Sequence, residues 1–207
     1  AAHAVLARDE GGQIVEVLLE QRDDREVLVF ADDNAACRPD GELEKVHFRG
    51  RGEQRLVGEV HTKARLTPKV FVQRDYNYRT PQTDLTAMAD NDVGFAGGVV
   101  EYGAHFRDAE QGQRIATVRA QERKCERQVL YGKSTLGTFG AGTSWELLGH
   151  PRGDRSLLIT QVLHHARQAG FSSAEGSEAG GYHNEFLALP IDVSFRPARL
   201  TPRPRVG

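Results

Sequence analysis

The chain has 207 residues, of which 39% are hydrophobic, so it can supply the core of one large domain or two small ones. Its 27 basic residues are outnumbered by 29 acidic residues, which gives a formal net charge of -2. No global positive field therefore draws the chain onto nucleic acid or an anionic membrane. Cys37 and Cys125, the two cysteines of the sequence, are too far apart for a CxxC zinc cluster or a disulfide framework. We expect two inert thiols.

The two ends of the sequence carry no targeting or membrane signal. No apolar run approaches the roughly 18 residues that would span a bilayer, and the N-terminus lacks a basic region followed by an apolar stretch. We expect a soluble chain that is made in the cytoplasm. Because it begins at Ala1 without methionine and ends in the Pro- and Arg-rich run RLTPRPRVG, we also expect a piece of a longer protein.

The first third of the chain predicts strands and a surface connection. Residues 26–30 form a short apolar run that Asp32, Asp33 and Asn34 would end. Residues 38–55 are rich in charge and glycine, which indicates a connection across the surface. From Val57 the runs VGEVHTKARL and KVFVQRDYNY alternate apolar and polar residues, as strands with one buried face do. AMADNDVGFAGG is interpreted as a loop.

One long helix is predicted, from about residue 109 to residue 131. Asp108 and Gln111 form a plausible capping box, and Gly132 supplies the expected stop. A narrow apolar stripe should cover a sheet face, and its members recur at three-and-four spacing: Ile115, Val118, Cys125 and Val129.

Four strand-like runs follow the helix: TSWELLGHP, DRSLLITQVLHHA, YHNEFLALP and IDVSFRP. Residues 170–181 combine Gly, Ser, Ala and Glu without periodicity and predict a mobile loop between two antiparallel strands. The predicted fold class is α+β, a mainly antiparallel, barrel-like sheet with one long helix packed on it.

No catalytic, cofactor-binding or metal-binding residues are predicted. His164 and His165 are neighbours in a predicted strand, so they should point to opposite faces and not chelate one metal. His150, Asp154 and Ser156 are the residue types of a hydrolytic triad but lack a GxSxG elbow. GAGTS at 140–144 lacks the ending of a phosphate loop. The basic run at 119–127 is interleaved with Glu122 and Glu126, which favours a solvated face or a subunit interface over nucleic-acid binding.

The order of several segments resembles a known family. The segments are RDYNYRTP (74–81), RDAEQGQRIATVRAQ (107–121), LLGHPRGDRSLLITQVLHH (147–165) and YHNEFLALPIDVSFRPARLTPRPRVG (182–207), with VLVFADD (27–33) before them. In this order they resemble the hub region of VgrG, the spike protein of type VI secretion systems, which is similar to the baseplate hub proteins of contractile phages.

The resemblance implies a domain organisation. Residues 1–56 would be an incomplete connecting part of the hub, and residues 57–207 a second hub β-barrel that ends at the linker to an oligonucleotide-binding-like domain. A first hub barrel, that domain and a β-helical spike would lie outside this sequence.

The resemblance also implies a structural function without enzymatic activity. Three copies would close into a homotrimeric ring whose inner strands line a channel. The ring would dock the Hcp tube, contact baseplate proteins, and carry the spike with effectors or their adaptors, without cofactor, nucleic acid or small-molecule substrate. The protein would be cytoplasmic before assembly and injected into target cells on firing. One alternative is the hub of a phage tail or an extracellular injection particle; another is an independent binding module.

Overall fold

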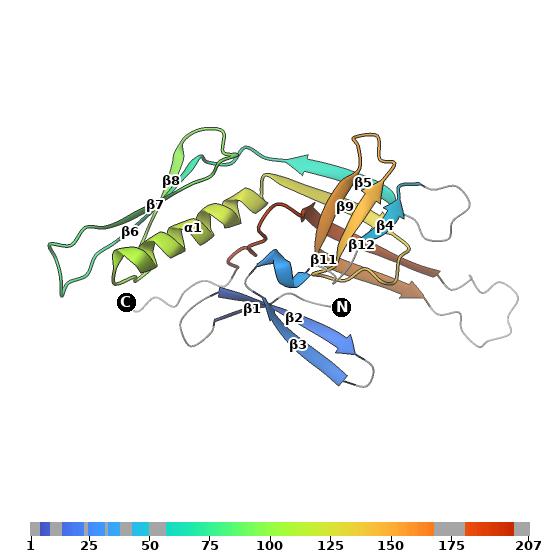
Figure 1. The fold of residues 1–207 in the computed structure, drawn as a ribbon, viewed down its shortest axis with the longest axis horizontal. Helices are drawn as coiled ribbons and strands as arrows, with labels where there is room; N and C mark the ends of the chain where they lie inside the picture. The colour runs from blue at the N-terminus through green and yellow to red at the C-terminus, as the bar shows by residue number, and fades with distance from the viewer. Residues whose placement is uncertain are drawn as a thin grey trace, which may run out of the picture. The chain divides into compact units, whose positions relative to one another are not determined.

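The computed structural model describes residues 33–37, 43–49, 57–167 and 181–200, with the backbone alone at residues 35 and 36 and in three strands nearer the N-terminus (Figure 1). The chain forms two compact units. Unit 1 comprises Ala1–Lys63 and Gln128–Asp192, and unit 2 comprises Ala64–Arg127 and Val193–Gly207. The first segment of unit 2 is therefore inserted between the two segments of unit 1, and its second segment follows unit 1 in the sequence.

Unit 1 begins with a small antiparallel sheet of order β1-β2-β3, formed by β1 (Val5–Arg8), β2 (Ile14–Arg22) and β3 (Arg25–Ala31). β3 confirms the strand predicted at 26–30. The short 3-10 helix η1 (Asn34–Cys37) follows, where the acidic and amide residues were expected to end the strand.

The main sheet of unit 1 has six strands in the order β4-β10-β11-β12-β9-β5. Their bounds are β4 (Glu44–His47), β5 (Val57–Ala64), β9 (Gln128–Ser134), β10 (Ser144–Leu148), β11 (Arg155–Arg167) and β12 (Gly181–Pro190). A parallel bridge between Phe48 and Val57 joins the two ends of this strand order, and the Arg49 N–H donates to the Val57 carbonyl at 3.1 Å. The sheet therefore curls into a barrel.

The barrel has an aromatic core. Trp145 is fully buried, with its ring 4.9 Å from that of Phe139, and Phe186 meets both rings in T-shaped contacts. A register shift after Ile159 inserts Thr160 as a bulge, so Ile159 and Val162 both reach the core. The other core members are aliphatic: Val46, Val57, Leu130, Leu136, Leu147, Leu157 and Ala188.

Unit 2 contains a three-stranded sheet of order β7-β6-β8, from β6 (Val70–Asp75), β7 (Leu85–Asp90) and β8 (Gly98–Tyr102). Its helix, α1 (Ala109–Cys125), packs on this sheet through Ala116 and Ala120, which meet Phe71 and Ala87. The α+β class, mainly antiparallel with one long helix, is confirmed. The sheet that α1 covers is the separate sheet of unit 2.

The start of α1 is confirmed and its predicted end is wrong. Asp108 is the N-cap and accepts from the Gln111 N–H at 2.8 Å, while the Gln111 side chain accepts from the Arg107 N–H. The helix ends at Cys125, not at Tyr131, and Gly132 lies inside β9. Residues 130–134 of β9 pair with β12, because Leu130 can then enter the barrel core while Tyr131 points outward.

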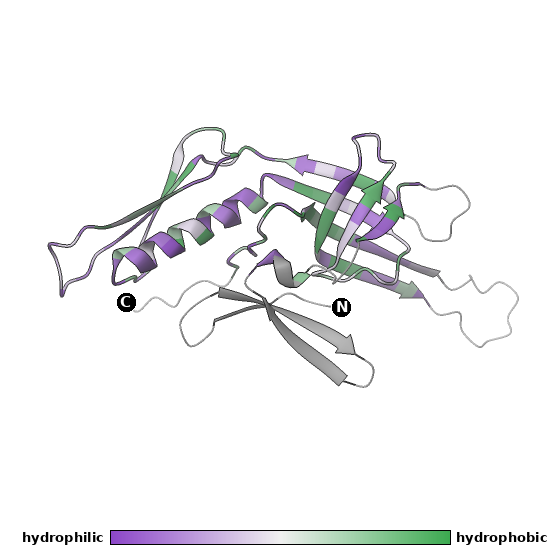
Figure 2. Ribbon diagram, viewed as in Figure 1, coloured by the Kyte–Doolittle hydropathy of each residue, from purple (hydrophilic) through white to green (hydrophobic). Residues whose placement is uncertain are grey.

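The predicted apolar stripe of α1 is also wrong. The buried helix residues are Gly112, Ala116, Arg119, Ala120, Glu122 and Cys125, whereas Ile115 and Val118 are only partly buried. Hydrophilic residues cover most of α1 in Figure 2, interrupted by short hydrophobic patches. Small residues face the sheet because they let the helix approach closely.

Two loop and strand predictions need correction. Ala87–Asp90, expected in a loop, belongs to β7, and the loop is confined to residues 91–97. Residues 191–197, expected as a strand, form no regular element. Most of the predicted loop at 170–181 lies outside the described residues. The assignment of residues 57–207 to a second hub barrel stays a prediction, since the compact units divide the chain elsewhere.

Candidate functional site

The second face of α1 carries charges that are buried within unit 2. Arg119 and Glu122 form an ion pair one helical turn apart, and their side chains are 5% and 10% exposed. Burial lowers the pKa of the Arg119 guanidinium, and the hydrogen bond to Glu122 opposes that shift. Such a pair is stable only when both partners are present, since either charge alone would be stranded in the interior.

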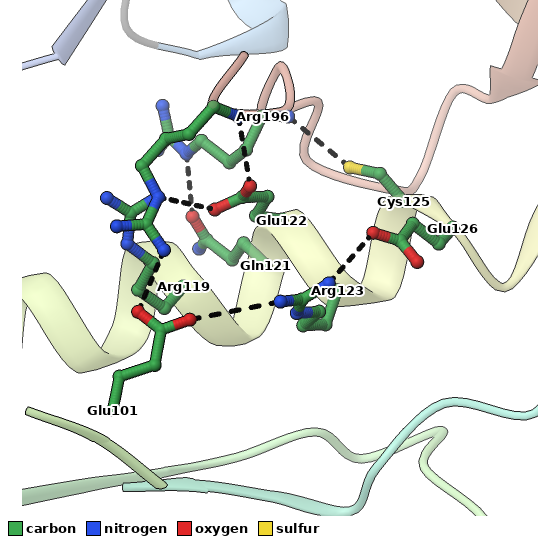
Figure 3. Close-up of polar contacts among 9 residues, drawn as sticks. Glu101, Arg119, Gln121, Glu122, Arg123, Cys125, Glu126 and Arg196 are labelled. Carbon is green, nitrogen blue, oxygen red and sulfur yellow. Dashed lines mark hydrogen bonds and ion pairs between the residues drawn. The ribbon is translucent and has the colours of Figure 1, made fainter. Parts of the chain in front are cut away.

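The C-terminal segment of unit 2, described here over residues 193–200 and called the exit segment, is fixed to this face of α1 (Figure 3). The Arg199 N–H donates to the Glu122 carboxylate at 3.2 Å, and its guanidinium donates to Glu101 at 2.8 Å. Arg196 donates through Nε to Gln121 Oε1 at 2.8 Å. We call this set the exit clamp, and its members are Glu101, Arg119, Gln121, Glu122, Cys125, Arg196 and Arg199.

Cys125 completes the exit clamp as a protonated thiol. Its Sγ donates to the Ser194 carbonyl and accepts from the Arg196 N–H, both at 3.3 Å. Burial raises the pKa of Cys125 to about 11, so it is no thiolate at neutral pH. Ion pairs join Arg119 and Arg199 to Glu122, and Arg199 also to Glu101, so the clamp holds this segment on α1.

The basic run at 119–127 is largely neutralised inside unit 2. Besides Arg119, Arg123 pairs with Glu126 at 3.2 Å and Lys124 with Asp92 at 2.9 Å. Glu122 and Glu126, each three residues after its arginine, could be expected from the sequence. Asp92, which comes from another part of unit 2, could not. The expectation of a solvated face fails for Arg119, which is buried and paired with Glu122, the residue that the exit segment contacts.

The three-stranded sheet leaves its other face open. Met88, Val72 and Val100 form a row across the three strands, and Arg74 pairs with Tyr102 in the next row. Met88, Val100 and Tyr102 are 56%, 64% and 71% exposed. We call these five residues the open face. Single exposed apolar residues are ordinary, but a row of them on one sheet indicates a contact surface.

The outer side of the barrel carries a groove of about 410 Å³. Its apolar floor includes Tyr131, Leu163 and Leu187, and Lys133 pairs with Glu185 at 3.1 Å on its rim. The carboxylate raises the pKa of Lys133, and the ammonium in turn lowers the pKa of Glu185. The strands β5, β9, β12 and β11 supply these residues.

The histidines singled out in the sequence serve local structure. His164 and His165 point to opposite faces, as predicted: His164 Nδ1 lies 2.6 Å from the Tyr182 hydroxyl, and His165 stacks on His183 at 4.6 Å. Sequence reasoning missed both partners, because they come from β12 through the strand register.

The triad residue types do not form a catalytic chain. His150 Nδ1 accepts from the Arg152 N–H at 3.2 Å, while Asp154 accepts from the Gly149 N–H at 2.7 Å. Both side chains thus stabilise the turn between β10 and β11. Burial, with the charges of Arg155 and Arg152, lowers the pKa of His150. In the predicted turn at 140–144, Thr143 accepts from and Gly142 donates to the backbone of Ile159.

Within the described ranges, no group of three or more His, Cys, Asp or Glu is placed to hold a metal ion. No helix in this part of the chain is long and apolar enough to cross a membrane.

Comparison with known proteins identifies the kind of molecule. Residues 7–170 match the phage tail baseplate hub (GPD) family. The chain belongs to this family. A curated relative of this baseplate hub chain is the type VI secretion system spike protein VgrG4b of Pseudomonas aeruginosa, 27% identical over 149 residues. The match covers 65% of this chain and 18% of that relative, so the chain spans a small part of its length.

Solved structures show the same fold. The 43 kDa tail protein of prophage MuSo2 from Shewanella oneidensis aligns with a TM-score of 0.57 at 14% identity, covering 86% of this chain and 51% of that one. The tail protein from Neisseria meningitidis MC58 aligns with a TM-score of 0.53 at 11% identity, covering 83% and 50%. The family match confirms the resemblance to baseplate hub proteins, and these structures confirm the fold.

Proposed function

We propose that the chain is a wall of the trimeric hub of a type VI secretion spike, which docks the Hcp tube and carries the spike and its effectors. The observation that carries this proposal is the family match over residues 7–170, joined to the similarity with the VgrG4b spike protein. The role is mechanical, and the chain acts without enzymatic turnover, cofactor or small-molecule substrate. The protein is cytoplasmic before assembly and leaves the cell with the spike.

Two surfaces support assembly with further chains. A cyclic trimer is built from heterologous contacts, so each copy must present two different patches. The open face and the groove on the barrel are candidates for these patches, since each carries exposed apolar side chains. Aromatic residues, methionine and arginine are the types that protein interfaces favour, and Tyr102, Met88 and Arg74 belong to them.

Light scattering of the purified chain over a wide concentration range tests the proposal. A mass three times that of the monomer is expected at high concentration. A monomer at every concentration would contradict the proposal that this segment carries its own ring contacts.

The structural comparisons favour a second candidate, the hub of a contractile phage tail or extracellular injection particle. Both aligned structures are tail proteins, one of them from a prophage. The genes beside this one distinguish the two machines, because capsid genes indicate a phage and a secretion ATPase indicates a type VI system.

A further inference from the structure

At one end of the sheet in unit 2, two loops meet in a notch of about 340 Å³. One loop follows β6 and the other precedes α1. The notch is lined by aromatic, basic and amide side chains: Tyr76, Asn77, Tyr78, Arg79, His105, Phe106 and Arg107. No aspartate or glutamate of the described residues lines it, although 27% of the chain is charged and acidic residues are in excess. We call it the arginine notch.

Hydrogen bonds to one side chain hold the backbone of the arginine notch in place. Asp75 accepts from the N–H groups of His105 and Phe106 with one oxygen and from the Tyr76 N–H with the other. One carboxylate thus fastens the two loops together. Phe106 is 3% exposed and lies so close to Gly112 that a Cβ there would meet its ring at 2.6 Å. This anchor fixes the loop that carries Arg107.

Arg79 is held in place by its neighbours. Its N–H donates to Asn77 Oδ1 and its Nε to the Tyr78 hydroxyl, both at 3.0 Å, with the guanidinium 5.5 Å from the Tyr78 ring centre. Because the Tyr78 hydroxyl accepts from Nε, the two terminal nitrogens of the Arg79 guanidinium are available to another acceptor. Arg107 likewise has no carboxylate partner among the described residues.

We propose that the arginine notch binds a carboxylate-bearing segment of a partner protein, with Arg79 and Arg107 on the carboxylate and Tyr76 and Tyr78 on the neighbouring apolar side chains. Guanidinium groups bind carboxylates through paired, charge-assisted hydrogen bonds, and tyrosine with arginine dominates the energy of protein interfaces. This inference goes beyond the hub function and does not depend on trimer formation.

The charges around the notch favour a protein segment over nucleic acid. Asp84, Asp108 and Glu110 are exposed close to it in sequence, on the same two loops and the first turn of α1. A continuous phosphate backbone would meet these carboxylates, whereas one glutamate or aspartate of a peptide would meet only the guanidinium groups. The net charge of -2 also opposes a polyanion.

The test uses the 207-residue chain and an array of nine-residue peptides with glutamate at the centre, flanked by each pair of apolar residues. A matched array carries glutamine instead. Binding to glutamate peptides above their glutamine partners is expected, and the best peptide is then measured by fluorescence anisotropy. Arg79→Gln and Arg107→Gln should each weaken its binding about tenfold or more, because each removes a charge-assisted contact.

Arg114→Gln is the matched control, since it removes an exposed arginine from α1 outside the notch, and it should leave binding unchanged. Thermal melts of all three variants check that they fold. Equal binding to both arrays, binding to neither, or binding that survives both notch variants would overturn the proposal. A single-stranded oligonucleotide that binds more tightly than the best peptide, and is lost with the same variants, would overturn it in favour of nucleic acid.

Discussion

At the scale of single residues, Gly132 decides how the barrel core closes. It lies in β9 directly opposite Phe186, whose ring covers the glycine so closely that a Cβ would fall 2.2 Å from a ring carbon. The ring can rest on the backbone only where no side chain stands. The same ring contacts Trp145 and Phe139, so the absence of a methyl group at position 132 allows the three rings to pack together.

Gly132→Ala should lower the free energy of unfolding by about 1–3 kcal/mol, the usual cost of overpacking a core. Urea denaturation measures this, followed by the fluorescence of Trp145, the single tryptophan of the chain. Gly58→Ala in β5 is the control, because a Cβ there meets nothing within 4 Å, and its effect should stay within about 0.5 kcal/mol. Equal changes in the free energy of unfolding for the two variants would show that the Phe186 ring does not exclude a side chain at position 132.

The buried thiol of Cys125 should make the protein less stable at alkaline pH. Its pKa is about 11 in the folded protein against an ordinary value of 9.0, so folding favours the protonated thiol. The stabilisation is complete below pH 9 and is lost as pH rises from 9 to 11. The loss amounts to roughly 2–3 kcal/mol, because each tenfold change in the acid dissociation constant corresponds to about 1.4 kcal/mol.

Urea denaturation at several pH values measures this loss in the wild type and in Cys125→Ala. The variant removes the thiol and should lack this part of the decline, while other alkaline titrations remain in both proteins. Parallel curves for the two proteins would contradict the predicted state of Cys125.

At the scale of elements, α1 has two different partners. Its small residues face the sheet, and Arg119 and Glu122 face the exit segment, so the helix needs no wide apolar stripe. Because the clamp bonds are charged and directional, they fix the direction of the exit segment more sharply than apolar packing would.

Glu122→Leu should cost about 3–5 kcal/mol, because it strands the buried Arg119 charge. The double variant Arg119→Met with Glu122→Leu should recover most of this loss, since it removes both charges. Glu126→Gln, in a more exposed pair, should cost less than about 1 kcal/mol. Chemical denaturation of the three variants measures the differences, and a double variant as unstable as the single one would refute the stranded-charge argument.

Neighbouring residues of β6 should respond in opposite ways to the same change. Phe71 is 1% exposed and packs under α1, whereas Val72 belongs to the open face. Phe71→Glu buries an unpaired charge and should expose the amides of α1 to hydrogen exchange. Val72→Glu should leave their protection intact. Equal exchange in both variants would show that the helix does not depend on this face.

At the scale of the whole molecule, the family and the open face together predict assembly. Val100→Lys places a charge on β8, at one end of the Met88, Val72 and Val100 row, and should abolish the trimer in light scattering, with an unchanged circular dichroism spectrum. Leu66→Lys is the control, since Leu66 is 80% exposed outside the open face, and it should assemble normally. Trimers of Val100→Lys would place the subunit contact elsewhere.

The sequence by itself determined the α+β class, most strand positions, the Asp108 cap of the helix and, through the order of its motifs, the baseplate hub family. These features are encoded locally, because strand alternation and helix capping involve residues a few positions apart. The opposite faces of His164 and His165 followed from the same two-residue period.

Only the tertiary structure decided the end of α1, its buried face and the partners of its charges. Residues 126–131 could continue a helix, but pairing with β12 and burial of Leu130 in the barrel place residues 128–131 in strand β9 instead. Arg119 is buried and paired with Glu122, which the distant segment around Arg199 contacts, and the arginine notch exists because Asp75 joins two loops that are 30 residues apart. Burial and charge pairing depend on neighbours in space, and a local pattern does not name those neighbours.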